Sequence, residues 1–295
     1  MTSDCTSDSA ATPNHVPEHA PEHAPEHAPE SAPDDASDCH ASVLRDVLGV
    51  YDHRYLSLDR LQRERLVDGT RRVLGEEGLS EAVRAALPAS ARLRAFCIRH
   101  GLREELERLI RDEAEGSPAG AVVVGGRIYA MYPYLRGVPR QDADITTEVG
   151  VDHRLDAVGW QGRQVRIRGV AALQRVETNR TAVDLILRER TSGREHGFPA
   201  VPRPDGARGF EAVADPAAVE PGRWDVHVAA TALGVTREAR FGAVRAGGLR
   251  TGPQRRAAGA KDVAVYFTKG GHLALLVTGA PGGTSPLARL LRRFR

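Results

Sequence analysis

Apolar positions alternate with polar ones from Trp160 to Phe241, with the period of two that is typical of β-strands. Between Val165 and Leu173 every second residue is apolar or glycine, and the intervening positions include Arg166 and Arg168. Further alternating runs occupy residues 183–187, 224–230, 235–241, 263–267 and 273–277. Short strands with clean alternation and no helices between them predict an antiparallel β-sandwich.

Glycine pairs mark two hairpins in this pattern. Gly125-Gly126 lies between an apolar run at 122–124 and another at 128–132, and Gly270-Gly271 lies between the last two alternating runs. Within the run that starts at Trp224, the phase places the tryptophan in the core and turns Asp225 and His227 outward.

Before the strands, from Ser42 to about Glu115, the apolar period becomes that of amphipathic helices. Ser57, Ser80 and Ser90 precede the apolar runs and are suitable N-caps. Alternating charges coat the outer positions, as is usual for a solvated helix surface. We therefore expect three or four short helices that form a packing module rather than a site.

Residues 1–40 are polar and acidic, with three copies of Pro-Glu-His-Ala beginning at Pro17. A proline at every fourth position excludes a helix, so we expect a disordered tail whose histidines lack the alignment that a metal site needs. The predicted fold class is therefore α+β, with a small α-helical linker unit before an antiparallel β-sandwich. The expected domains are the tail at 1–40, the helical unit at 41–116, the sandwich at 117–280 and a basic tail at 281–295.

Charge is distributed unevenly, although the formal net charge is only +2. Residues 1–40 carry nine acids and no lysine or arginine, so the remainder carries +11. From Arg245 to Arg295 there are ten basic residues and a single acid, Asp262. Such a surface attracts polyanions or an anionic membrane face. A nucleic-acid binder is an alternative that rests on net charge alone, so we do not favour it.

Three acidic motifs are candidates for chemistry. Asp142 and Asp144 have the Asp-x-Asp spacing with which nucleotide-sugar transferases hold a divalent cation, but no nucleotide-binding α/β pattern precedes them. The Asp-His pairs at 52–53 and 152–153 have adjacent side chains that point apart on a strand, and no activated nucleophile accompanies them. We therefore expect no catalytic residue, no metal site and no cofactor.

Outward arginines and exposed aromatic rings are the candidate contact residues. Two arginines on one predicted strand and two on the next would form a basic face for a phosphate-bearing polymer, and two tyrosines beside a proline would stack on a sugar. The alternative is an ordinary solvated strand face in a chain with only two lysines. The predicted polymer-binding residues are Arg166, Arg168, Arg188, Arg190, Tyr132 and Tyr134.

The segment Val50–Leu61 (VYDHRYLSLDRL) resembles the region that follows the catalytic domain in bacterial family 2 glycosyltransferases related to the wall teichoic acid glycosyltransferases. The segment Arg92–Arg111 resembles the end of the helical linker in that family. The family's C-terminal immunoglobulin-like sandwich resembles the strand pattern at residues 165–171, 185–190 and 222–226. The resemblance covers roughly residues 43–280.

In that family an N-terminal α/β domain transfers the sugar, and the C-terminal region is implicated in oligomerisation and in engaging the anionic polymer acceptor. Only the low-complexity residues 1–40 come before the matched segment in this sequence, so we expect no catalytic residue to carry over. The resemblance implies a non-catalytic accessory protein that binds an anionic cell-wall glycopolymer, a glycosyltransferase partner or copies of itself. The alternative is a truncated or split glycosyltransferase whose catalytic domain is encoded separately.

The remaining features concern location. Cys5, Cys39 and Cys97 are odd in number and widely spaced, so they indicate no disulfide framework. No signal peptide or apolar membrane span is recognisable. We expect a cytoplasmic protein, with peripheral contact at the inner membrane face as a further possibility for its basic surface.

Overall fold

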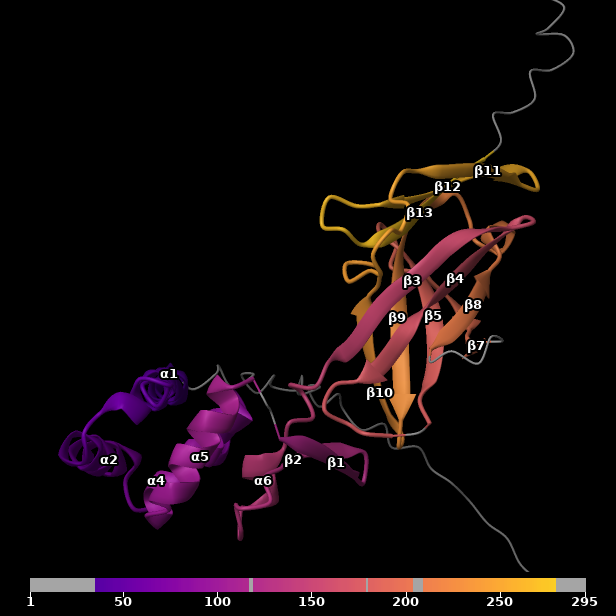
Figure 1. Cartoon of the computed structure of the whole chain (residues 1–295). Coiled ribbons are helices and arrows are strands. Elements are labelled where there is room, and N and C mark those ends of the chain that lie inside the picture. The colour runs from indigo at the N-terminus through magenta and orange to yellow at the C-terminus, as the bar shows by residue number, and fades with distance from the viewer. Residues whose placement is uncertain (1–34, 117–118, 179, 204–208, 280–295) are drawn as a thin grey trace, which may run out of the picture.

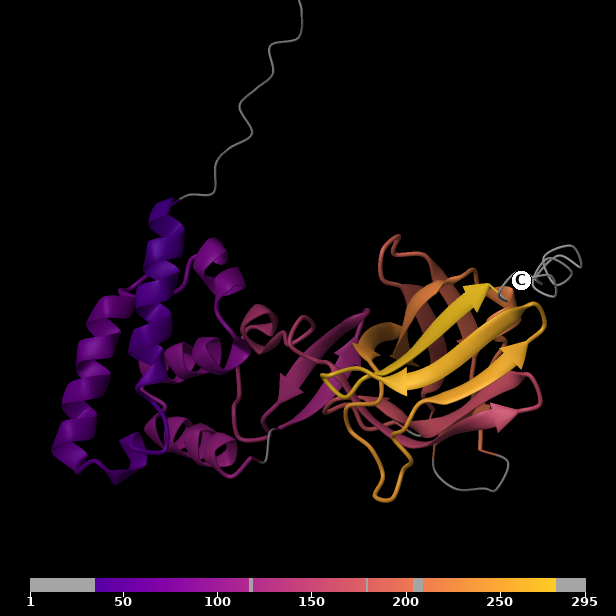
Figure 2. The same cartoon turned by 90° about the horizontal axis from the view of Figure 1, so that it is seen from above.

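The computed structural model describes residues 35–116, 119–178, 180–203 and 209–279. It contains a helical unit and an antiparallel β-sandwich, joined through a small hairpin (Figure 1, Figure 2). The predicted fold class is therefore confirmed. The first 34 residues of the predicted tail and the predicted basic tail at 281–295 lie outside the described residues.

The helical unit begins earlier than its pattern predicts. Its first helix starts at Asp35, inside the segment expected to be tail, whereas the apolar period suggested a start at Ser42. Pro33 is the last proline before this helix, so the backbone beyond it is free to form one. The helices are α1 (Asp35–Gly49), η1 (Tyr55–Ser57), α2 (Arg60–Leu74), α3 (Glu81–Ala86), α4 (Ala89–His100) and α5 (Arg103–Ala114).

Two of the three predicted serine caps are wrong. Ser80 caps α3 by accepting from the Val83 amide, as expected. Ser57 lies in the short 3-10 turn instead, and Asp59 caps α2 through a reciprocal capping box with Gln62. Helix α4 starts one residue before Ser90, where the Glu148 carboxylate, remote in sequence, accepts from the Ala89 amide at 2.7 Å. A carboxylate from another part of the chain replaces the local cap there, which no local pattern reveals.

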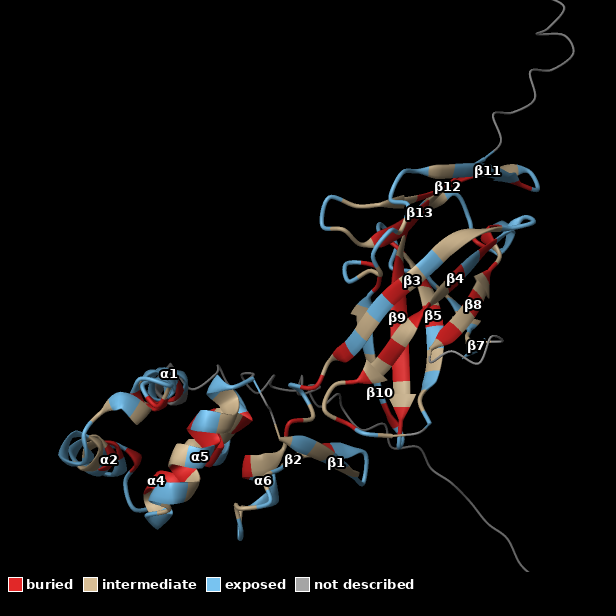
Figure 3. Cartoon of the chain, in the orientation of Figure 1, coloured by how far each residue is buried: buried red, intermediate tan, exposed pale blue. Residues whose placement is uncertain are grey.

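The helices bury one face each against a common core. Tyr51 and Tyr55 lie at its centre, almost fully buried, with their rings 5.0 Å apart. The Tyr51 hydroxyl donates to Thr70 Oγ1 at 2.7 Å, so the polar end of this buried ring has a partner. The outer faces of the helices are exposed, as the predicted charge pattern requires (Figure 3).

The predicted glycine-pair hairpin is present as β1 (Gly120–Val124) and β2 (Arg127–Met131). Gly125 and Gly126 both have positive φ, the conformation that a two-residue turn of this type requires. The hairpin forms a two-stranded sheet of its own, however, rather than part of the sandwich as the expected span 117–280 implied. The short helix α6 (Arg140–Ala143) follows it.

The sandwich consists of two antiparallel sheets. The smaller has the order β3-β4-β8-β7, and the larger has the order β11-β12-β13-β9-β5-β6, with β10 also paired to β9. The smaller sheet contains β3 (Val151–Gln161), β4 (Gln164–Leu173), β7 (Val201–Pro202) and β8 (Phe210–Ala214). The larger contains β5 (Ala182–Glu189), β6 (Glu195–Pro199), β9 (Gly222–Ala232), β10 (Val235–Arg240), β11 (Gln254–Ala258), β12 (Lys261–Phe267) and β13 (Leu273–Gly279). A 3-10 turn, η2 (Pro216–Ala218), lies between β8 and β9.

The apolar faces of the two sheets form the sandwich core, as the alternating pattern predicts. Trp224 is fully buried, and its indole nitrogen donates to the Glu220 carbonyl at 2.9 Å. Full burial of a large apolar side chain stabilises a fold by about 1.5–3 kcal/mol. His227 lies on the outward face of β9 as predicted, but it is only 9% exposed, and its Nδ1 lies 2.6 Å from Glu238 on β10. Burial lowers the pKa of His227.

Candidate functional site

The four predicted arginines do not form one face. Arg166 and Arg168 lie on β4 in the smaller sheet, whereas Arg188 lies on β5 and Arg190 directly after it in the larger sheet. The two strands turn their apolar residues toward each other in the shared core. Their outward positions consequently lie on opposite outer faces of the sandwich.

Three of these arginines are held by acids. Arg168 lies 2.5 Å from Glu211 on the neighbouring strand β8. The guanidinium of Arg188 bonds to two glutamates on strands β6 and β10, and Arg190 bonds to Asp225 on β9 at 2.6 Å. Arg166 is exposed and has no acidic partner in the described part of the chain. Of the predicted set, Arg166 is therefore the residue most available to a polyanion.

The two predicted tyrosines lie at the junction with the helical unit. Tyr134 donates to Asp112 on α5 at 2.7 Å, and the Arg108 guanidinium lies 4.3 Å from the centre of its ring. Burial and the bond to Asp112 raise the pKa of Tyr134. Tyr132 lies beside it, with ring centres 5.8 Å apart. Tyr134 has a packing role in the structure, so its ring face is not a free platform for a sugar.

The Asp-x-Asp carboxylates point to different partners. Asp142 is buried and accepts from Arg84 Nε at 2.7 Å, whereas Asp144 accepts from Arg127 at 2.8 Å and from the Thr146 amide. Within the described residues no three His, Cys, Asp or Glu side chains are grouped so as to hold a metal ion. Asp142 instead joins α6 to α3, and Asp144 joins the residues after α6 to β2.

Arg92 lies at the centre of the junction between the helical unit and the segment that leads into β3. It is 7% exposed and donates to the backbone carbonyls of Leu87, at 2.6 Å, and of Asp142 and Asp144. Its guanidinium also lies 3.5 Å from Glu148, the carboxylate that caps α4. A guanidinium with five donors is suited to satisfying several carbonyls at once. Arg92 thereby joins the helical unit to the segment that leads into β3.

The two Asp-His pairs have no catalytic geometry. His53 is exposed, Asp52 is half-buried, and their closest charged atoms are 4.0 Å apart. His153 packs at 5.6 Å against the Phe241 ring, and its buried Nδ1 has no partner among the described residues. Burial and the nearby His272 lower the pKa of His153, which keeps its ring neutral at physiological pH.

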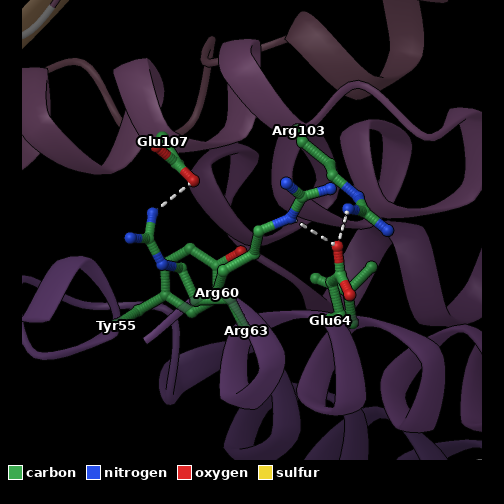
Figure 4. Close-up of a pocket in the computed structure, with 7 residues that line it drawn as sticks. Tyr55, Arg60, Arg63, Glu64, Arg103 and Glu107 are labelled. Carbon is green, nitrogen blue, oxygen red and sulfur yellow. Dashed lines mark hydrogen bonds and ion pairs between the residues drawn. The ribbon is translucent and has the colours of Figure 1, made fainter. Parts of the chain in front are cut away.

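The helical unit contains a hollow of about 270 Å³ between α2 and α5 (Figure 4). Its charged residues are bonded to one another: Arg60 and Arg103 share Glu64, and Arg63 lies 2.5 Å from Glu107. Glu64 therefore has a pKa below its ordinary value because of its bonds to the two arginines. Three arginines against two glutamates leave the lining with a net charge of +1, but each arginine is already bonded to a glutamate.

Unpaired positive charge gathers instead at the end of the sandwich farthest from the helical unit. The β3–β4 and β11–β12 hairpin turns both lie there in the two views (Figure 1, Figure 2). Strand β11 is fixed beside β3, where Gln254 donates to the Val158 carbonyl at 3.5 Å. We call this region the basic end, defined by the exposed residues Arg163, Arg166, Arg255 and Arg256, none of which has an acidic partner among the described residues.

Three members of the basic end were missed by the sequence pattern. Arg163 lies in the β3–β4 turn, and Arg255 and Arg256 are adjacent on an edge strand, where both alternating positions are accessible. The sequence feature that could have pointed to Arg255 and Arg256 is the cluster of basic residues from Arg245 onward, which contains a single acid. That signal indicated a basic tail, because the sequence did not show that part of this segment folds as strands of the sandwich.

A family model matches the sandwich, and two solved structures match most of the chain. Residues 144–277 match the family model described as TarS beta-glycosyltransferase C-terminal domain 1. A comparison with curated proteins found no match. Among solved structures, the chain is similar to residues 217–571 of TarS from S. aureus, with 13% identity, a TM-score of 0.48, and coverage of 84% of this chain and 77% of that one.

The structure of S. aureus TarS itself is matched at 14% identity and a TM-score of 0.41, and the match covers 49% of its length. The chain thus spans about half of that protein. No helix in the described part of the chain is long and apolar enough to cross a membrane. Residues 144–277 therefore resemble a TarS C-terminal domain, which confirms, for the sandwich, the resemblance inferred from the sequence.

Proposed function

We propose that the chain is a non-catalytic accessory protein that binds an anionic cell-wall glycopolymer through the basic end. The observation that carries this proposal is the group of four exposed arginines without acidic partners, on two neighbouring hairpins. Arginine binds phosphate through a planar fork of donors, which suits a phosphate-bearing chain. The proposal keeps Arg166 from the predicted set and replaces the other five residues.

The surrounding charge supports the same choice. Residues 144–277 contain 20 lysines and arginines against 15 acids, and many of the acids are already paired with arginines. Strand β13 ends at Gly279, which pairs with Lys261 at the β11–β12 turn. The described part of the chain therefore ends at the basic end, and the sequence contains four further arginines in residues 280–295.

The experiment is a titration of the full chain with polyribitol phosphate. We expect binding to weaken at least tenfold when Arg166, Arg255 and Arg256 are all replaced by glutamine. The matched control replaces the exposed arginines Arg54, Arg65 and Arg111 of the helical unit, which gives the same change in net charge. Equal weakening in both variants would show a general charge effect, and the basic end would not be the site.

A second candidate is support of a separately encoded glycosyltransferase catalytic domain. The matched family model, a C-terminal domain of a beta-glycosyltransferase, favours it. Co-purification of the full chain with the product of a neighbouring glycosyltransferase gene would test this role. A chain that elutes alone in the presence of that product would exclude it.

A further inference from the structure

One face of the β1–β2 hairpin is apolar and exposed. Its inward residues, including Val123 and Ile128, pack against the sandwich core. Its outward residues are not the polar ones expected of a sheet face in water: Val122, Val124 and Met131 are 38%, 47% and 51% exposed. Contiguous exposed apolar side chains of this kind mark interaction surfaces.

This face forms one side of a hollow of about 480 Å³, which we call the hairpin hollow. The segment after β2 forms the other side, with Tyr132, Pro133, Leu135 and Val138. Leu135 and Val138 also pack against the core of the helical unit. The hollow therefore lies where the hairpin meets the helices, and its walls are apolar and aromatic.

The lining of the hairpin hollow is positively charged, and the nearby acids Asp112 and Glu113 are bonded to Tyr134 and Arg94. Arg140 is the charged residue in its lining, and the exposed Arg136 lies between two lining positions. Neither arginine has an acidic partner in the described part of the chain. Arg127 at the hairpin turn is 67% exposed, although it bonds to Asp144. The matching occupant is a segment with small apolar side chains and carboxylates.

The chain's own N-terminal segment has this chemistry. Residues 1–34 contain seven acids and no lysine or arginine, and the Pro-Glu-His-Ala repeats place a glutamate beside each proline. Proline-rich segments dock in aromatic-lined grooves, where the proline ring contacts the aromatic faces. Here Tyr129, Tyr132 and Pro133 line the hollow, and the arginines lie close enough to its rim to meet the glutamates.

The N-terminal segment is also attached close enough to the hairpin hollow, and is long enough, to reach it. The N-terminal segment joins α1 at Asp35, in the helical unit that packs against one side of the hollow. Thirty-four residues span up to about 110 Å when extended, so chain length does not limit the contact. Tethering gives an effective concentration on the order of millimolar, so even a weak contact would be occupied.

We propose that the hairpin hollow binds the Pro-Glu-His-Ala repeats of the chain's own N-terminal segment. Hydrogen exchange of the full chain tests this. In a Glu22→Lys/Glu26→Lys variant, amides of residues 127–138 should exchange at least threefold faster than in the wild type, because the repeats no longer match the arginines. The control variant Asp4→Lys/Asp8→Lys has the same charge change outside the repeats and should behave as the wild type.

Equal exchange in all three proteins overturns the proposal, and so does equal acceleration in both variants. Protection that rises with protein concentration in every variant would indicate a second copy in the hollow, which also overturns it. A second experiment adds a synthetic peptide of residues 16–31 to the Glu22→Lys/Glu26→Lys protein. The peptide should bind at least tenfold more weakly after Met131→Lys than after Val244→Lys, which alters a valine of similar exposure elsewhere. Equal affinity for both would exclude the hollow as the site.

Discussion

The guanidinium of Arg92 lies 3.5 Å from the carboxylate of Glu148, and the two residues belong to the two halves of the molecule. Arg92 is on α4, and Glu148 follows α6 on the way into β3. The same carboxylate accepts from the first amide of α4, and the guanidinium satisfies carbonyls on both sides of the junction. Arg92 is thus a central contact of the junction between the helices and the sandwich, together with the Arg84–Asp142 ion pair and the Tyr134–Asp112 hydrogen bond.

We expect Arg92→Met to lower the free energy of unfolding by about 3 kcal/mol, since it leaves buried carbonyls and a carboxylate without their partner. Urea denaturation measures this change. Arg65→Met, at an exposed position on α2, is the control and should change stability by less than about 0.5 kcal/mol. A loss for Arg92→Met as small as that of the control would show that the junction is held elsewhere.

Glycine at position 169 is required by close packing between β3 and β4. A Cβ there would lie 2.5 Å from the Arg154 carbonyl oxygen and 2.7 Å from the Phe241 ring. We expect Gly169→Ala to destabilise the sandwich by about 1–3 kcal/mol, as overpacking does. Gly159→Ala on β3, where a Cβ meets nothing within 4 Å, is the matched control. Similar melting temperatures for the two variants would contradict this account.

The sandwich was predictable because alternation is a local signal, and the strand from Val165 to Leu173 shows it completely. The junction was not predictable, because nothing in the local sequence distinguishes Arg92 from the exposed arginines of the same helices. Its burial depends on carbonyls some fifty residues away in sequence. The ion pairs of the predicted binding arginines were not predictable for the same reason. Arg188 alternates outward as expected, but only the strand order places Glu195 and Glu238 beside it.

Tyr51 should make stability depend on pH in the alkaline range. Burial raises the pKa of Tyr51 to about 12 in the folded protein, against an ordinary value of about 10. The contribution of Tyr51 is therefore complete below pH 10 and is lost as the pH rises toward 12, because the unfolded chain ionises first. The loss is on the order of 2 kcal/mol. Tyr51→Phe should be less stable at pH 8 but should show a smaller decline above pH 10 in urea titrations.

Cys97 should be chemically inert in the folded chain. It is buried, and burial raises the pKa of its thiol to about 12, so little reactive thiolate forms. We expect a variant with Cys5 and Cys39 replaced by serine to resist a thiol reagent at pH 8 until denaturant is added. In a second variant, in which Cys39 is kept and only Cys5 is replaced, the exposed Cys39 should react within the mixing time of a manual assay. Rapid labelling of Cys97 without denaturant would mean that the helical core opens readily.

The salt dependence of polyribitol phosphate binding tests the central claim most directly. The full chain and the Arg166→Gln/Arg255→Gln/Arg256→Gln variant are titrated at low and at physiological salt. If the basic end binds the polymer, the wild type should bind in both conditions, with an affinity reduced on the order of tenfold by salt. The triple variant should bind the polymer weakly at both salt concentrations, and its affinity should change less between them than that of the wild type. Wild-type binding that disappears at physiological salt, or that matches the variant in both conditions, would contradict the claim.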